Sequence, residues 1–153
     1  MRKTYRILAD LIAILVAVQA MTMVFAIAGL FHWIEDEGGS VDKAVFDSWE
    51  DDHPTFQGAI GVPIHAMVGM YLIPLVALAL LVVAFLAGID GGVKWAAIIV
   101  VSVVVQVAAG LAAESAPWLG LIHGLNAFAL FSVAIVAART AHPDAQTASA
   151  AAA

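Results

Sequence analysis

Two histidines inside apolar segments carry the clearest chemical signal in this chain. His65 lies just inside one long apolar segment, and His123 lies just inside another. An imidazole in the hydrocarbon of a bilayer is unfavourable unless it has a partner or a function. Two neutral imidazoles at one level of a helical bundle can ligate a haem iron from both sides, which gives a six-coordinate, low-spin centre. The two residues therefore predict a metal site, with iron of haem b as the metal.

Other roles for the histidine pair stay open at the level of the sequence. A Zn or Cu site could use the same two side chains, but no carboxylate or thiol at that depth completes the ligand set. The histidines could instead make hydrogen bonds between helices or relay protons.

A porphyrin also needs small residues and apolar walls around its iron ligands. We expect Gly69, Gly110 and Gly124 to leave room for the porphyrin close to the histidines, and Met67 and Phe128 to line it with apolar side chains. We predict that these five residues contribute to cofactor binding. Because Gly is frequent at helix interfaces in membranes generally, the glycines also suit ordinary helix packing.

The composition assigns the chain to the membrane proteins. Of its 153 residues, 63% are hydrophobic and 12% are charged, and the mean hydropathy is +1.01. The chain has no cysteine, which excludes disulfides, c-type haem attachment and iron–sulfur clusters held by cysteine. The net charge of −6 gives no indication of nucleic-acid binding.

Four apolar segments are long enough to cross a bilayer, which takes roughly 20 helical residues. We expect an all-α, integral-membrane, four-helix up-down bundle over 1–139 and a disordered tail over 140–153. The first apolar run exceeds the core of a secretory signal peptide, so we expect it to be retained. The spans are predicted at about 7–31, 60–86, 93–113 and 117–138.

The basic residues predict the orientation. Lys and Arg lie before the first span and next to the third and fourth spans, whereas Lys43 is the single Lys or Arg of the loop over 32–59. The positive-inside rule then places both termini in the cytoplasm and this loop outside. We expect a multi-pass protein of a prokaryotic plasma membrane, with both histidines near the outer ends of their helices.

The loop over 32–59 is strongly acidic. A short amphipathic helix is expected over 40–49, with Ser40 as its N-cap and Asp42 in its first turn. The loop could be a simple solvated segment or a docking surface for a basic partner or a cation. Its acids are Glu35, Asp36, Glu37, Asp42, Asp47, Glu50, Asp51 and Asp52.

The four spans show a hint of internal duplication. Gln19 lies in the first span and Gln106 in the third, while His65 and His123 lie in the second and fourth. A helix pair with glutamine and then histidine, repeated once, would relate the histidines by a pseudo-twofold axis. The glutamines could bond neighbouring helices or contact a quinone or the edge of a haem.

Several motifs of the second half resemble the haem A synthase family. They are the segment 105–111, the pair Pro117-Trp118, the segment Leu121-Ile122-His123 and Ala127. His65 resembles the other haem-ligating histidine of one four-helix half of that family. The resemblance implies one bis-histidine haem b, and two such chains would have to associate to equal the usual two-half enzyme.

The chain also departs from that family. Ala66 follows His65 where the family usually has arginine, and the cysteine pair frequent in its outer loop is missing. Small four-helix bacterial membrane proteins of no assigned activity are similar as well, including at Ala138-Arg139.

Three functions therefore follow as expectations. The first is a membrane b-type cytochrome that transfers electrons near the outer face, with quinol as a possible donor. The second is a half-size haem A synthase-like oxidoreductase. The third is a cofactor-free accessory or assembly subunit of a larger respiratory or other membrane complex. Homo-oligomers are compatible with each.

Overall fold

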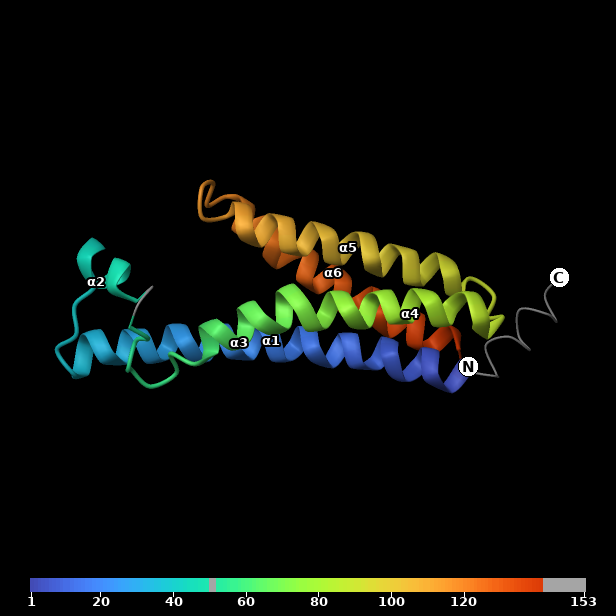
Figure 1. Ribbon diagram of the computed structural model, residues 1–153, viewed down its shortest axis with the longest axis horizontal. Helices are drawn as coiled ribbons and strands as arrows, with labels where there is room; N and C mark the ends of the chain where they lie inside the picture. The colour runs from blue at the N-terminus through green and yellow to red at the C-terminus, as the bar shows by residue number, and fades with distance from the viewer. Residues whose placement is uncertain (50–51, 142–153) are drawn as a thin grey trace. The chain divides into compact units, whose positions relative to one another are not determined.

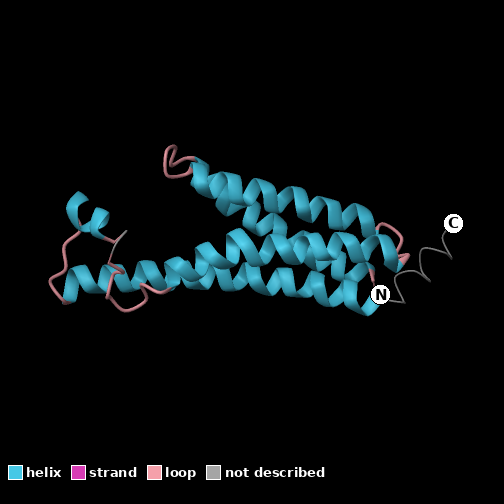
Figure 2. Cartoon of the chain, viewed as in Figure 1, coloured by secondary structure: helices cyan, strands magenta, loops and turns pink. Residues whose placement is uncertain are grey.

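The computed structural model describes residues 1–49 and 52–141, and these residues form helices and connecting loops without any strand (Figures 1 and 2). Four helical segments are long and apolar enough to cross a membrane, as the sequence predicted. They are α1 (Arg2–Asp36), the continuous segment Gly61–Ala87, α5 (Gly92–Ala112) and α6 (Leu119–Thr140).

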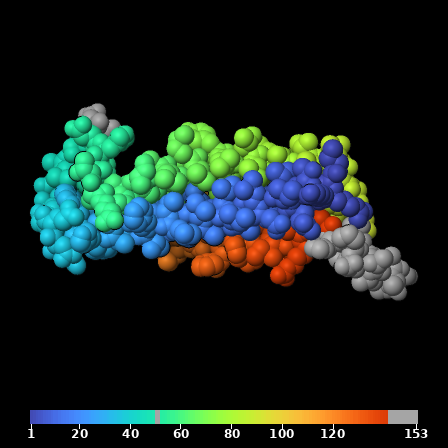
Figure 3. Space-filling model, turned by 90° about the horizontal axis from the view of Figure 1, so that it is seen from below, coloured from blue at the N-terminus to red at the C-terminus, as the bar shows by residue number. Residues whose placement is uncertain are grey.

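α1 is the helix that departs most from its predicted bounds. Its apolar run was expected at about 7–31, whereas the helix extends through the charged residues on both sides. Helical backbone hydrogen bonds form equally well among polar side chains that lie in water, so hydropathy marks the membrane span and not the helix ends. Figure 3 shows the surface of α1 in blue, and its exposed apolar side chains include Ile7, Ile14, Met21 and Val24.

The second span changes its helical register in the middle. It consists of α3 (Gly61–Met67), the π-helix η1 (Val68–Leu72) and α4 (Ile73–Ala87). Pro74 is the second residue after the π-helix. Because proline has no N–H to donate to the carbonyl of Met70, and its ring crowds that carbonyl, a widened turn is favoured just before it.

The chain divides into two compact units, each of which is described by itself. The first contains Met1–Ala17 and Gly69–Ala153. In this unit α5 packs against both α4 and α6. Tyr5 is fully buried and donates from its hydroxyl to the Gly92 carbonyl at 2.9 Å. The core of the unit contains the fully buried side chains Ile12, Leu80, Ile99 and Leu130.

The second unit, Val18–Val68, contains the rest of α1, the acidic loop and α3. α3 approaches α1 very closely at Gly61, where an added Cβ would overlap the Thr22 carbonyl oxygen and lie 3.1 Å from the Ala26 Cβ. Glycine is therefore needed here so that the two backbones can pack.

The short helix of the acidic loop exists but starts later than predicted. α2 spans Lys43–Ser48, and its N-cap is Asp42 and not Ser40. Asp42 has an extended backbone and its carboxylate accepts the Val45 N–H at 2.9 Å, which is the geometry of an N-cap. Lys43 forms an ion pair with Asp47 at 2.7 Å. Glu50, Asp51 and the tail over 142–153 lie outside the described residues.

Candidate functional site

His65 of α3 contacts the backbone of α1. Its ring nitrogen Nδ1 lies 3.1 Å from the carbonyl oxygen of Gln19, and the side chain is half-buried. The same carbonyl also accepts the Thr22 hydroxyl at 2.9 Å. All of these groups belong to the second unit.

His123 of α6 makes the same contact in the first unit. Its Nδ1 lies 2.9 Å from the carbonyl oxygen of Gln106 on α5. The same contact thus recurs at the two glutamines and two histidines that the proposed repeat relates. Each histidine is anchored to the backbone of the helix that precedes its own span.

These contacts show that Nδ1 of each ring carries a proton. A carbonyl oxygen can only accept a hydrogen bond, so Nδ1 of each histidine must carry a proton and donate it. A neutral imidazole with its proton on Nδ1 has its lone pair on Nε2, the atom that can ligate a metal. Histidines that ligate metals nearly always donate their other ring N–H in this way, to a carboxylate, a carbonyl or water.

Gly110 provides space for the His123 ring. An added Cβ at Gly110 would lie 2.9 Å from Nδ1 and 3.0 Å from Cε1 of His123. These distances are shorter than ordinary van der Waals contact, so any larger residue would push the ring away from the Gln106 carbonyl. Gly110 is thus a predicted small residue that the structure brings against a histidine.

The structure gives the surroundings or the unit of the remaining predicted residues, but it does not bring them together into one site. Gly124, on α6, has open space where a Cβ would lie. Met67 is 59% exposed and Phe128 is 75% exposed, so both side chains are accessible to lipid or a cofactor. His65 and Met67 belong to the second unit, and His123, Gly69, Gly110, Gly124 and Phe128 to the first. Their joint contact with one cofactor stays a prediction.

A polar network beside His123 includes Ser102, a residue that the sequence analysis missed. Asn126 donates from Nδ2 to the Gln106 side-chain oxygen at 2.7 Å and to the Ser102 carbonyl at 2.9 Å. The Ser102 hydroxyl donates in turn to Asn126 Oδ1 at 3.0 Å. Ser102 precedes Gln106 by four residues and so lies on the same helix face, which is the signal that could have revealed it.

The amide of Gln19 contrasts with that of Gln106. The Gln19 side chain is only 8% exposed, and its Nε2 is buried without a hydrogen-bond partner among the described residues. Leu15 lies four residues before Gln19, as Ser102 lies four residues before Gln106. Val68 lies three residues after His65, as Asn126 lies three residues after His123. Apolar side chains at both places provide no hydrogen-bonding group for the amide.

No group of three or more His, Asp or Glu side chains that could hold a metal ion occurs among residues 1–49 and 52–141. Of the other histidines, His32 contacts Asp36 at 2.7 Å and Glu37 at 3.5 Å.

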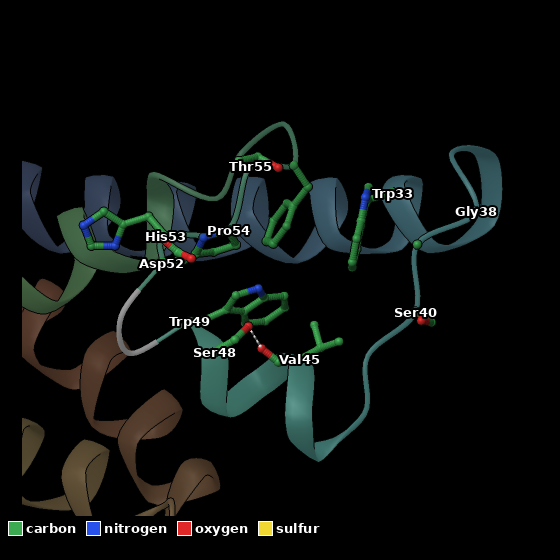
Figure 4. A pocket seen from close by; sticks show the side chains of 12 residues that line it. Trp33, Gly38, Ser40, Val45, Ser48, Trp49, Asp52, His53, Pro54 and Thr55 are labelled. Atoms are coloured by element: carbon green, nitrogen blue, oxygen red, sulfur yellow. Dashed lines mark hydrogen bonds between the residues drawn. The ribbon is translucent and has the colours of Figure 1, made fainter.

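A separate pocket of about 390 Å³ lies in the acidic loop, within the second unit (Figure 4). Its aromatic wall contains Trp33 from α1, Trp49 from the end of α2, and Phe56. The remaining lining residues are Gly38, Gly39, Ser40, Val45, Ser48, Asp52, His53, Pro54 and Thr55.

No protein-family model, no curated protein and no solved structure matches this chain.

Proposed function

We propose that this chain is a small integral-membrane b-type cytochrome whose haem iron is ligated by His65 and His123. The observation that supports the proposal most is the repeated hydrogen bond from a histidine Nδ1 to a glutamine carbonyl. It orients each ring and directs the lone pair to Nε2. Haem, when bound, supplies the one-electron redox chemistry, and the protein supplies ligation and an apolar environment.

The surroundings of the rings fit this group. Gly110 leaves room for the His123 ring, and both histidines are half-buried in segments able to cross a membrane. Histidines that served only to hold helices together would not need to present the same nitrogen in both pairs. The protein is expected to pass electrons between a membrane donor such as quinol and an acceptor at the face that bears the acidic loop.

Haem binding is tested by the reduced-minus-oxidised visible spectrum of the detergent-purified protein, together with its haem content. The wild type should show sharp low-spin b-type bands and one haem per chain. His65→Ala and His123→Ala should each lose those bands, because each removes one iron ligand.

His32→Ala is the matched control, since His32 contacts loop carboxylates and lies outside the proposed ligand set. It should keep the wild-type spectrum. A wild type that stays colourless after haem addition would contradict the proposal and favour an accessory subunit. Retention of low-spin haem in both alanine variants would contradict the ligand assignment.

A further inference from the structure

The pocket of the acidic loop is not part of the proposed haem site, and its chemistry indicates a ligand of its own. All its lining residues lie between Trp33 and Phe56, within one compact unit. Its volume of about 390 Å³ falls within the range of small-molecule sites, which are mostly apolar with a few polar groups.

The wall of the pocket is a cluster of aromatic rings. The centroids of Trp33 and Phe56 are 6.0 Å apart, those of Trp49 and Phe56 are 5.9 Å apart, and those of Trp33 and Trp49 are 6.4 Å apart. These separations are typical of rings in direct contact, so the cluster is a preformed surface. Figure 4 shows Trp33 and Trp49 approaching the pocket from different elements.

The local backbone holds this surface in place. The Gly39 N–H donates to the Trp33 carbonyl at 2.9 Å, and the Gly39 Cα lies against the Trp33 indole so closely that a Cβ would overlap it. On the other side, the Ser48 hydroxyl donates to the Val45 carbonyl at 2.7 Å and closes the end of α2 (Figure 4). The pocket is therefore preformed by contacts near in sequence.

The charge around the pocket is negative. Asp52 is the one acidic side chain among the described lining residues, and no ion pair involves it in the described part of the chain. Lys43, the basic residue of the loop, is already paired with Asp47. An anionic ligand would be repelled here, whereas a cation would be attracted by Asp52 and by the faces of the indoles.

We propose that the pocket between Trp33, Trp49 and Asp52 binds an organic cation of the alkylammonium class. Indole faces attract such ions most strongly among the aromatic side chains, and quaternary ammonium groups are recognised by aromatic residues in many proteins. The ion could be a soluble metabolite or the headgroup of a lipid, since both present the same chemistry.

The test is a titration with tetramethylammonium, read by tryptophan fluorescence in a Trp95→Phe/Trp118→Phe background. The emission then comes from Trp33 and Trp49 alone. Saturation at roughly millimolar concentration is expected, as suits a small ligand with few contacts. Sodium chloride controls for ionic strength, and tert-butanol controls for a neutral molecule of similar shape.

Asp52→Asn should weaken tetramethylammonium binding by about fivefold, because it removes one nearby charge and keeps the side-chain shape. Glu35→Gln is the matched control, since it removes a charge near the end of α1, outside the pocket lining, and it should leave the affinity unchanged. Trp33→Leu should abolish saturation, with Trp49 fluorescence and far-UV circular dichroism showing whether the loop stays folded.

Two results would overturn the proposal: no saturable response to tetramethylammonium, or an equal response to tert-butanol. Lipid nanodiscs distinguish the sources of the ion. A lower tetramethylammonium affinity in phosphatidylcholine discs than in discs of an uncharged galactolipid would identify a lipid headgroup, and equal affinity would identify a soluble ion. Because none of these readouts involves haem, the result is independent of the proposed electron transfer.

Discussion

The two glutamine–histidine pairs share one contact and differ in almost everything around it. In both, a histidine Nδ1 donates to the carbonyl of a glutamine on the preceding long helix. Around His123, Gln106, Asn126 and Ser102 satisfy one another. Around His65, the Gln19 amide nitrogen is buried without a partner among the described residues. What the pairs share is the orientation of the imidazoles, and that is the feature a metal ligand requires.

The largest effect on stability is expected from a substitution at Gly61, the glycine that lets α1 and α3 pack closely. Gly61→Ala should destabilise the α1–α3 pair by about 3 kcal/mol, because its Cβ would overlap the Thr22 carbonyl and backbone cannot yield without moving a helix. Thermal unfolding followed by circular dichroism measures the loss. Gly120→Ala on α6, where a Cβ meets open space, should change stability far less. Equal effects at the two positions would refute the packing argument.

Gly110→Ala should disturb the Gln106–His123 contact, because its side chain would push against the His123 ring. The new Cβ would displace the ring from the Gln106 carbonyl, with an expected loss of about 2 kcal/mol. The low-spin bands should weaken together with stability. Gly120→Ala is again the control, since Gly120 lies on the same helix as His123 with open space where a Cβ would lie, and it should retain both the stability and the bands. A Gly110→Ala protein with a wild-type spectrum would show that the His123–carbonyl contact is not needed for haem.

The glutamine amides should respond in opposite ways. Gln106→Leu removes the acceptor of Asn126 Nδ2 and should cost about 1 kcal/mol. Gln19→Leu removes a buried donor without a partner and should be neutral or slightly stabilising. Unfolding of both variants in the same detergent gives the comparison. A clear destabilisation by Gln19→Leu would mean that a ligand, lipid or other helix satisfies that amide in the intact protein.

The smallest effect is expected at Thr22. Its hydroxyl shares the Gln19 carbonyl with His65, and Thr22→Val keeps the shape while removing the bond. The expected loss is about 0.5 kcal/mol, as for an average side-chain hydrogen bond between membrane helices. The His65 Nδ1 proton signal in the NMR spectrum should move, whereas that of His123 should stay in place. An unchanged His65 signal would argue against a shared acceptor.

The sequence was sufficient to predict the four long helices, because runs of apolar residues of bilayer length have few alternatives. It failed at features governed by local geometry. Ser40 and Asp42 are both residues favoured as N-caps, and in the structure the extended backbone of Asp42 lets its carboxylate reach the Val45 N–H. The ends of α1 were missed because charged residues continue a helix as readily as they end it.

For the candidate site, the sequence drew attention to both histidines and both glutamines but did not predict the contacts between them. The glutamines were expected to act through their side chains, whereas their backbone carbonyls are the acceptors of the histidines. Hydropathy and residue type carry no information about a backbone carbonyl, which every residue has. Gly110 was identified as a small surface, but its contact with the His123 ring depends on how α5 and α6 pack.

The central claim is that each histidine supplies one iron ligand through Nε2. The most direct measurement is the electron paramagnetic resonance spectrum of His65→Gly and His123→Gly before and after addition of free imidazole. We predict loss of the low-spin signal in both variants and its return with imidazole, because the ligand can then be supplied from solution. A low-spin signal that persists without imidazole in either variant would contradict the claim.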